Sequence, residues 1–283
     1  MPALSHRTLL LTALAMLAFA GNSLLCRLAL RDTAIDPASF TALRLISGAL
    51  ILLALLRLGK APSSPQGSWI AAAMLFVYAG AFSLAYLHLD AGVGALILFG
   101  SVQLGMSGWG LFRGERLTAL QTSGLALAAL GLAFWLLPGA NAPSLRGTLL
   151  MIVAGLAWAG YSLIGRGAGD PLANTAGNFL RASPLGLVML LAYAGNWQID
   201  GLGLAYALMS GALTSGLGYA IWYTALKELS AIQGASVQLS VPVIAALLGS
   251  LLLAESLSLR LLLVSALTLG GISLVLWGKT RQG

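Results

Sequence analysis

The amino-acid sequence predicts an all-α membrane protein in which ten transmembrane helices form two inverted five-helix repeats, with both the N and C termini cytoplasmic. Three observations lead to this fold class. Apolar residues make up 59% of the 283 residues and charged residues only 8%, against about 25% charged in soluble domains. The apolar residues gather in runs of about 20, the length that crosses a bilayer. The two halves also repeat one another, and copies with an odd number of spans must insert in opposite directions.

Each of the ten predicted helices is an apolar run bounded by charged residues, glycine or proline. At a rise of about 1.5 Å per residue, roughly 20 helical residues cross about 30 Å of hydrocarbon. The connections between the runs are short, so we expect no soluble domain among them. In chain order, the predicted spans cover residues 8–30, 38–57, 68–88, 91–112, 118–138, 147–165, 172–195, 201–226, 231–253 and 259–278.

The two halves of the chain share sequence at a nearly constant offset. Residues 18–27 align with residues 157–166 with six identities in ten positions, 139 residues apart. The Ser-Val-Gln-Leu sequence at 101–104 recurs at 236–239, 135 residues apart. Composition bias alone would give scattered matches without a fixed register. We therefore predict two five-helix repeats, the second inverted relative to the first: residues 1–140 and residues 141–283.

The basic residues are distributed unevenly over the two faces of this arrangement. Arg31, Arg146 and Arg260 fall at one face, whereas nine basic residues fall at the face that carries both termini. Cytoplasmic loops are enriched in Lys and Arg, so both termini are predicted to be cytoplasmic. The net charge of +7 is therefore a topology signal, and we expect no nucleic-acid partner. The nine residues are Arg7, Arg57, Lys60, Arg113, Arg116, Arg166, Lys227, Lys279 and Arg281.

The two glutamines of the repeated Ser-Val-Gln-Leu sequence are candidates for substrate contact. Gln103 lies about 18 Å into a span that enters from outside, and Gln238 about 11 Å into one that enters from inside. Both amides thus reach a similar level of the membrane and should face the bundle interior, because an amide in lipid is costly. The alternative is an interhelical hydrogen bond that only holds the bundle together, worth about 0.6 kcal/mol on average.

Aromatic residues recur at one-face spacing on several predicted spans, for example Tyr78 and Phe82 at i, i+4. Single stripes of this kind usually pack in a core. Four stripes on different helices, together with mid-membrane amides, favour a ring-lined cavity with a few polar anchors, which suits a flat aromatic or amphipathic solute. The aromatic candidates for its lining are Tyr78, Phe82, Phe99, Trp158, Tyr161 and Trp222.

Further polar side chains lie away from the span ends. Asn22 is deep in the first span, and Asn178 belongs to a polar stripe in the seventh that also contains Arg181; both asparagines are candidate substrate ligands. Arg44 is the counterpart of Arg181 in the first half. A guanidinium at this depth either holds a substrate carboxylate or binds structural partners such as loop carbonyls. We favour the structural role, because both halves keep the arginine.

Two prolines, Pro184 and Pro242, fall inside predicted apolar helices. Proline removes a backbone hydrogen bond and favours a kink. Each is therefore a candidate hinge for a conformational change, with a purely structural kink as the alternative, because membrane helices also tolerate proline for packing.

All eight acidic residues fall at span ends or in loops. A proton-coupled pump or a carrier of lipophilic cations normally needs a buried carboxylate, so facilitated exchange is favoured. A membrane enzyme would need Asp, His or Ser clustered at one interface, and only His88 and Asp90 stand together. A scaffold or channel component is a third class, which mid-membrane polar groups disfavour. We expect no catalytic residue, no cofactor and no metal site.

Short motifs also recur at matching places in the two halves. The sequence Pro-Ala-Ser-Phe-Thr-Ala-Leu-Arg at 37–44 opens the second span, and Glu-Arg-Leu at 115–117 and Glu-Ser-Leu at 255–257 separate the fourth and fifth spans of each half. With these motifs, essentially the whole chain resembles EamA-type members of the drug/metabolite transporter superfamily. The resemblance implies that the first four spans of each half line the transport pathway and that the fifth lies outside it.

Members of that family export amino acids and other metabolites, or move sugar phosphates and nucleotide sugars. Short loops, cytoplasmic termini and aromatic-lined spans make the chain similar to the bacterial YddG-type aromatic amino-acid exporters. We therefore expect a multi-pass secondary transporter that exports amino acids, aromatic ones first, across the bacterial inner membrane by alternating access. The alternative is export of another small metabolite, threonine- or homoserine-like, or of an amphipathic drug. The expected partners are a small-molecule substrate and the lipid bilayer, and the expected assembly is a monomer or homodimer.

Overall fold

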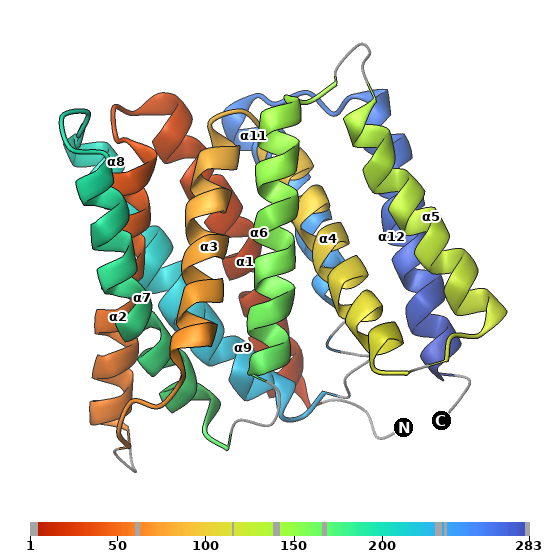
Figure 1. The fold of residues 1–283 in the computed structure, drawn as a ribbon, viewed down its shortest axis with the longest axis horizontal. Helices are drawn as coiled ribbons and strands as arrows, with labels where there is room; N and C mark the ends of the chain where they lie inside the picture. The colour runs from red at the N-terminus through yellow and green to blue at the C-terminus, as the bar shows by residue number, and fades with distance from the viewer. Residues whose placement is uncertain are drawn as a thin grey trace.

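The computed structural model describes residues 5–59, 63–114, 116–137, 142–165, 169–229, 234 and 237–280. Within these residues every regular element is a helix (Figure 1), which confirms the all-helical part of the prediction. The first half contains α1 (His6–Asp32), α2 (Pro37–Leu58), α3 (Trp69–Tyr86), α4 (Ala91–Phe112) and α5 (Ala119–Leu136). The second half contains α6 (Leu145–Ile164), α7 (Pro171–Ala192), α8 (Gly201–Met209), the π-helix η1 (Ser210–Leu217), α9 (Gly218–Leu226), α11 (Ser240–Leu253) and α12 (Leu259–Thr280).

Nine of the ten predicted spans match a helix or a continuous run of helices to within three residues at each end. In the ninth span α11 begins at Ser240; of the residues before it, 234, 237 and 238 are helical, and 231–233, 235 and 236 lie outside the described residues. Several residues used above lie outside the described residues, namely Lys60, Glu115, Arg166, Ser236 and Arg281.

Seven helices are long and apolar enough to cross a membrane: α1, α2, α3, α4, α6, the continuous run α8–η1–α9, and α12. Shorter apolar helices occupy residues 119–134 and 240–253. The remaining helix, α7, carries the polar stripe of Asn174, Asn178 and Arg181. The helices thus fit an integral, multi-pass membrane protein, and the count of ten spans stays a prediction.

Polar residues start the helices, and two of these starts are built alike. The carboxylate of Asp36 accepts hydrogen bonds from the first backbone N–H groups of α2, and the carboxylate of Asp170 does the same for α7. Each is followed by proline, at Pro37 and Pro171, in the first helical turn. The missing N–H of proline costs nothing there, because the first N–H groups of a helix have no partner within it. The same local device therefore opens the second helix of each half.

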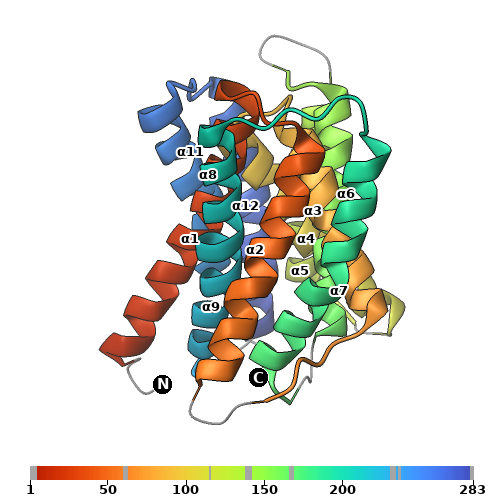
Figure 2. The ribbon, with the colours of Figure 1, turned by 90° about the vertical axis from the view of Figure 1, so that its left-hand side faces the viewer.

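The helices form one bundle in which segments from the two halves interleave (Figure 1). The helix α2 lies between α7 on one side and the run α8–η1–α9 on the other (Figure 2). The helix α1 packs on that same run and on α11, while α6 packs on α3 and α4. The start of α1 and the end of α12 lie at the same end of the bundle (Figure 1).

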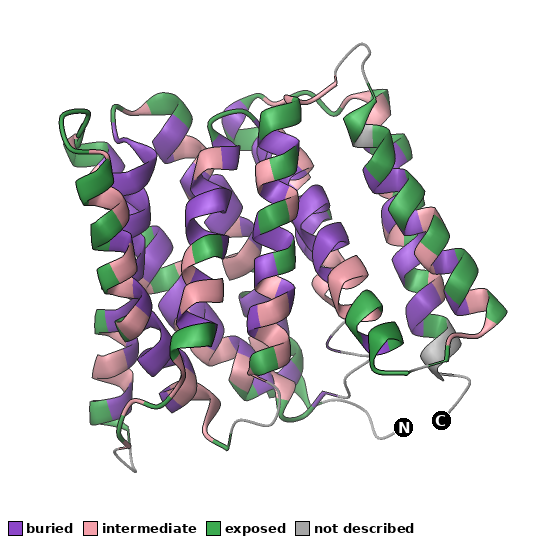
Figure 3. Ribbon diagram, viewed as in Figure 1, coloured by how far each residue is buried: buried purple, intermediate pink, exposed green. Residues whose placement is uncertain are grey.

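The helices α5 and α12 form a pair at one side of the bundle (Figure 1). Their backbones approach closely at Gly124 and Gly271, where an added Cβ would meet backbone atoms of the other helix. Small residues permit such close contacts in lipid, where van der Waals packing drives helix association. Exposed residues lie along the outer faces of the helices (Figure 3). They include large apolar side chains such as those of Leu50, Val188 and Leu251. This apolar exterior suits a lipid environment.

Candidate functional site

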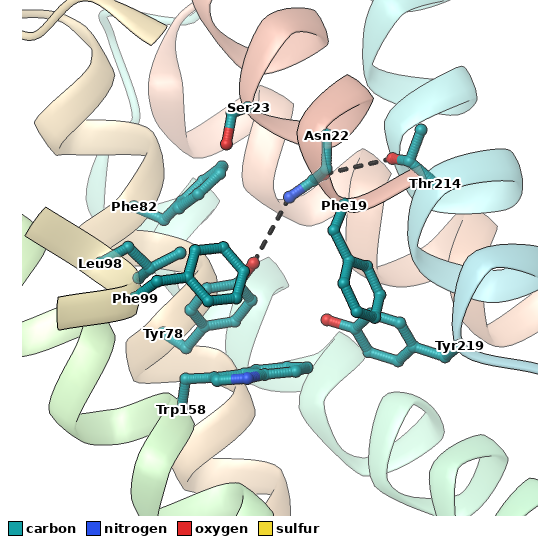
Figure 4. A pocket seen from close by; sticks show the side chains of 10 residues that line it. All are labelled: Phe19, Asn22, Ser23, Tyr78, Phe82, Leu98, Phe99, Trp158, Thr214 and Tyr219. Atoms are coloured by element: carbon teal, nitrogen blue, oxygen red, sulfur yellow. Dashed lines mark hydrogen bonds between the residues drawn. The ribbon is translucent and has the colours of Figure 1, made fainter. Parts of the chain in front are cut away.

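A cavity lies inside the bundle, enclosed by α1, α3, α4, α6, η1 and α9. Its empty volume is about 380 Å³, counting the open space at its mouth. Both halves of the chain contribute to it. The lining residues are Phe19, Asn22, Ser23, Tyr78, Phe82, Leu98, Phe99, Trp158, Thr214 and Tyr219 (Figure 4).

Aromatic rings make up most of the cavity wall, and Trp158 joins its two sides. The Trp158 ring centroid lies 4.8 Å from that of Tyr78 and 5.2 Å from that of Tyr219. Tyr219 in turn meets Phe19 edge-on at 5.9 Å, and Tyr78 meets Phe82 at 5.4 Å. Ring pairs at 4.5–7 Å in tilted or edge-on arrangements are favourable. The wall is therefore a continuous set of rings drawn from α1, α3, α6 and α9.

The amide of Asn22 is the main polar group of the cavity. Its Oδ1 accepts a hydrogen bond from Ser210 Oγ on η1 at 2.8 Å. The hydroxyl of Thr214, also on η1, lies 3.3 Å from this oxygen and 2.8 Å from the carbonyl of Ser210, and its one proton serves one of the two at a time. Its Nδ2 donates to Tyr78 Oη at 3.4 Å (Figure 4). Asn22 thereby links α1 to η1 and α3, which come from different halves of the chain.

Behind the rings lies the buried guanidinium of Arg44, which is only 1% exposed. Its Nη2 donates to Tyr78 Oη at 3.1 Å, and its Nε donates to Ser215 Oγ at 3.1 Å. The guanidinium carbon stands 5.1 Å from the ring centroids of both Tyr78 and Phe82, a cation–π geometry. Within the described residues, Arg44 Nη1 has no hydrogen-bond partner and no carboxylate pairs with the side chain.

The π-helical segment η1 supplies the three hydroxyls that meet Asn22 and Arg44, from Ser210, Thr214 and Ser215. Its backbone packs directly on α2, because a Cβ at Gly211 would overlap Ser47 and the carbonyl of Arg44. π-Helical turns are rare and occur frequently at functional sites. The wider turn of η1 thus brings three small polar side chains to the buried amide and guanidinium.

Five of the residues proposed from the sequence line this cavity: Asn22, Tyr78, Phe82, Phe99 and Trp158. Three others pack behind the wall. Tyr161 stacks on Trp158 with centroids 5.3 Å apart, and Trp222 meets Phe19 edge-on at 5.8 Å. Asn178 is fully buried but accepts a hydrogen bond from the backbone N–H of Ser68, in the connection before α3.

The two glutamines are not among the residues that line the cavity. Gln103 is half-buried on α4, one turn beyond Phe99. Gln238 is also half-buried, and its Nε2 donates to the carbonyl of Gly234 at 3.2 Å. The depth of a residue in the membrane follows from the sequence, but the direction in which it points around the helix axis depends on packing.

The two candidate hinge prolines occupy different positions. Pro184 lies in the middle of α7. Pro242 is the third residue of α11, where a missing N–H removes no intrahelical hydrogen bond. Residues 237 and 238, on the other side of Leu239, are also helical, so the kink expected near Pro242 stays a prediction. Whether either proline acts as a hinge stays a prediction.

Sequence reasoning did not select Phe19, Ser23, Leu98, Thr214 and Tyr219, which also line the cavity. Tyr219 shares a helix face with Trp222, so the aromatic stripe on α9 contained the signal. Phe19 and Ser23 lie three residues before and one residue after Asn22 on α1. Leu98 and Thr214 have no feature in the sequence that distinguishes them from packing residues.

An ion cluster lies at the end of the bundle away from the start of α1. Arg27 pairs with Asp90 and with Glu255, each at 3.3 Å, and its Nη1 donates to the carbonyl of Tyr86. Glu255 also accepts a hydrogen bond from the N–H of Ala91 at 2.9 Å. Burial raises the pKa of the Glu255 carboxyl above its ordinary value of 4.5, although Arg27 and the Ala91 N–H favour the ionised form. The cluster ties α1, the start of α4 and the connection before α12 together.

Among the residues that the structure describes, no three His, Cys, Asp or Glu side chains gather into a group that could hold a metal ion. The polar groups of the cavity are an amide, hydroxyls and phenols. The arrangement can therefore bind and orient a small solute between rings, with hydrogen bonds at one side.

The chain matches a protein family, two relatives and a solved structure. The model of the EamA-like transporter family matches residues 6–137 and again residues 145–277. An uncharacterised protein of Pseudomonas aeruginosa is 64% identical over 272 residues, which cover 96% of this chain and 95% of that protein. An uncharacterised transporter of Archaeoglobus fulgidus is 27% identical over 173 residues, which cover 57% of this chain and 58% of that transporter.

One solved structure, titled only as the crystal structure of a protein, has a TM-score of 0.67 to this chain. The match covers 95% of this chain and 96% of the other, at 20% sequence identity. At that identity the likeness concerns the fold alone.

Proposed function

Because the chain belongs to the EamA-like transporter family, we propose that it is a secondary transporter that exports amino acids, aromatic ones first, across the bacterial inner membrane. The observation that carries this proposal is the ring-lined cavity between the two halves of the chain. The family is one of transporters, which agrees with the expectation that the chain is not an enzyme.

The chemistry of the cavity suits an aromatic side chain. Six of the ten lining residues are aromatic, and they come from α1, α3, α4, α6 and α9. A flat ring placed between Trp158 and Phe99 buries apolar area and gains stacking contacts of about 0.5–1.5 kcal/mol each beyond that burial. Asn22 and Tyr78 supply hydrogen bonds at one side, which fix the orientation of the polar end of the solute.

The arrangement of the helices supports alternating access between two inverted halves. Matching helices of the two halves pair directly in α2–α7, α4–α11 and α5–α12, which is consistent with a two-fold axis that passes between them. The contacts of α3 with α6 likewise correspond to those of α8 with α1. In this proposal all ten helices span the membrane and both termini are cytoplasmic. The Arg27 cluster then closes the outer end of the bundle, opposite the termini.

The test is uptake into liposomes that contain the purified full-length protein. Labelled tryptophan, phenylalanine or tyrosine should accumulate faster than in protein-free liposomes, and Trp158→Ala should weaken the apparent affinity about tenfold, the value of one stacked ring. Trp109→Ala is the matched control, because Trp109 stands half-exposed near the end of α4, outside the cavity lining. Accumulation no faster than in empty liposomes for all three amino acids rejects the proposed function. Competition by threonine or by an amphipathic drug in the same assay separates the alternative substrates.

A further inference from the structure

Two polar side chains that line the cavity, Asn22 and Tyr78, each keep a hydrogen-bond donor for a ligand. The acceptor of Asn22, Oδ1, takes the hydrogen bond of the buried Ser210 hydroxyl at 2.8 Å. Its Nδ2 carries two hydrogens, and only one of them is directed to Tyr78 Oη. The amide therefore retains a donor for a ligand while its oxygen is turned away and satisfied.

The hydroxyl of Tyr78 is also left as a donor. Its oxygen accepts from Asn22 Nδ2 at 3.4 Å and from Arg44 Nη2 at 3.1 Å. A phenol has two acceptor lone pairs and one proton, so both lone pairs are in use. The proton has no acceptor among the described residues and is free for a group in the cavity. The hydroxyl of Tyr219 also points toward the interior of the cavity (Figure 4).

Arg44 adds a positive charge that nothing in the described part of the chain neutralises. The charge is buried, one Nη is unpartnered, and the guanidinium carbon stands 5.1 Å from the ring centroids of Tyr78 and Phe82, which both line the cavity. None of the described acidic side chains lines the cavity. A buried cation without a counter-ion is costly, and its field inside a low-dielectric bundle favours an anion and disfavours a second cation.

From these contacts we infer that the cavity recognises its ligand through a carboxylate, which accepts hydrogen bonds from Tyr78 and Asn22 and serves as the counter-ion of Arg44. An ammonium group is not required, because the cavity offers it no acidic partner and the field of Arg44 repels it. Aromatic monocarboxylates that lack the amino group are therefore ligands of this site. The inference rests on the proposed function, since it concerns the same cavity, and it names the chemical group that the cavity selects.

Two analogues of tryptophan test the inference on the wild-type protein. Indole-3-propionate keeps the ring and the carboxylate and lacks the amine, whereas tryptamine keeps the ring and the amine and lacks the carboxylate. Calorimetric titration of the purified full-length protein should give a Kd at least about tenfold lower for indole-3-propionate. Any smaller preference, or a preference for tryptamine, overturns the inference.

Variants of the chain assign the preference to the named side chains. Tyr78→Phe removes only the hydroxyl and should weaken indole-3-propionate at least about tenfold while leaving tryptamine unchanged. Arg44→Gln should abolish the preference. Arg181→Gln is the matched control, because Arg181 bonds to the carbonyls of Gln66 and Gly177 and does not line the cavity. If Arg44→Gln does not fold, Tyr78→Phe carries the test, and an unchanged preference in Tyr78→Phe contradicts the assignment.

The outcome is distinguishable from failure of the proposed function. A protein that binds indole-3-propionate with the stated preference but accumulates no labelled aromatic amino acid in liposomes supports the inference and rejects amino-acid export. A protein that transports tryptophan and binds tryptamine as tightly as indole-3-propionate supports amino-acid export and rejects the inference.

Discussion

Replacing Asn22 with leucine removes the amide that links α1 to η1 while keeping a side chain of similar size. Ser210 is fully buried and its hydroxyl donates to Asn22, so the change leaves a buried hydroxyl without its acceptor, at a cost of about 1–3 kcal/mol. Thr214 keeps its bond to the carbonyl of Ser210, and Tyr78 keeps its bond from Arg44. These two therefore add no more than about 0.6 kcal/mol each. We expect Asn22→Leu to lower the free energy of unfolding by about 2–3 kcal/mol.

A double-mutant cycle isolates the contact between Asn22 and Ser210. In the combination of Asn22→Leu with Ser210→Ala no buried hydroxyl is left unsatisfied, so the two changes together should cost less than the sum of their separate effects. The expected coupling free energy is about 1 kcal/mol, between the average of about 0.6 kcal/mol and the maximum of about 1.7 kcal/mol found for hydrogen bonds between membrane helices.

The cycle is measured by unfolding the full-length protein in mixed detergent micelles, followed by tryptophan fluorescence and circular dichroism. Ser273→Ala is the matched control for Ser210→Ala, because Ser273 lies exposed on α12 and bonds only to a backbone carbonyl of its own helix. Asn22→Leu and Ser273→Ala should be additive. A coupling free energy between Asn22 and Ser210 below about 0.3 kcal/mol, the usual scatter of additive pairs, refutes this account of the network.

Three further predictions concern parts of the molecule away from that network. Gly271→Val places a branched side chain against the backbone of α5, so the free energy of unfolding should fall by about 1–3 kcal/mol. The KM for transport should stay unchanged in uptake assays, because α12 does not line the cavity. An altered KM would contradict this prediction. Arg27→Gln leaves the carboxylate of Glu255 without its cation, and this side chain is only 7% exposed. The change should lower the midpoint of thermal unfolding more than Arg31→Gln does, because the ion pair of Arg31 is about one-third exposed. Equal midpoints for the two variants would refute this ranking. Because the pKa of Glu255 is raised in the folded protein, its contribution to stability is complete below the ordinary pKa of 4.5 and is lost as the pH rises through the raised value. Glu255→Gln cannot ionise, so thermal unfolding midpoints of this variant should fall less over the same pH range. A variant with the pH profile of the wild type would count against this prediction.

The sequence was sufficient to predict most of the helix boundaries. Apolar runs end where polar caps such as Asp36 and Asp170 begin the next helix, and these signals are local. The start of the ninth predicted span falls on residues 230–233, 235 and 236, which lie outside the described residues, so that boundary stays a prediction. The π-helix η1 was not predicted, since Gly211 and its neighbours fit an ordinary apolar helix equally well.

The candidate site was predicted in part, and the difference has a geometric cause. The stripes of Tyr78 and Phe82 on α3 and of Trp158 on α6 identified the wall, because rings on one face of a helix must be buried together. Gln103 was chosen from the repeated Ser-Val-Gln-Leu sequence and its depth in the membrane, and neither fixes the rotation of α4 about its axis. The guanidinium of Arg44 is held behind the cavity wall by hydrogen bonds to Tyr78 and Ser215. These residues come from other helices, so the contacts are visible only in the folded chain.

The central claim is that the ring-lined cavity is where the substrate binds, and protection of a cysteine there tests it directly. Cys26, the single cysteine of the chain, is buried, so Cys26→Ala provides a background for Leu98→Cys in the cavity wall. With tryptophan at ten times its Kd the site is free about 9% of the time, so alkylation of the cysteine at position 98 should slow about tenfold. Alkylation at the same rate with and without tryptophan, in a protein that transports it, would place the substrate elsewhere and contradict the account.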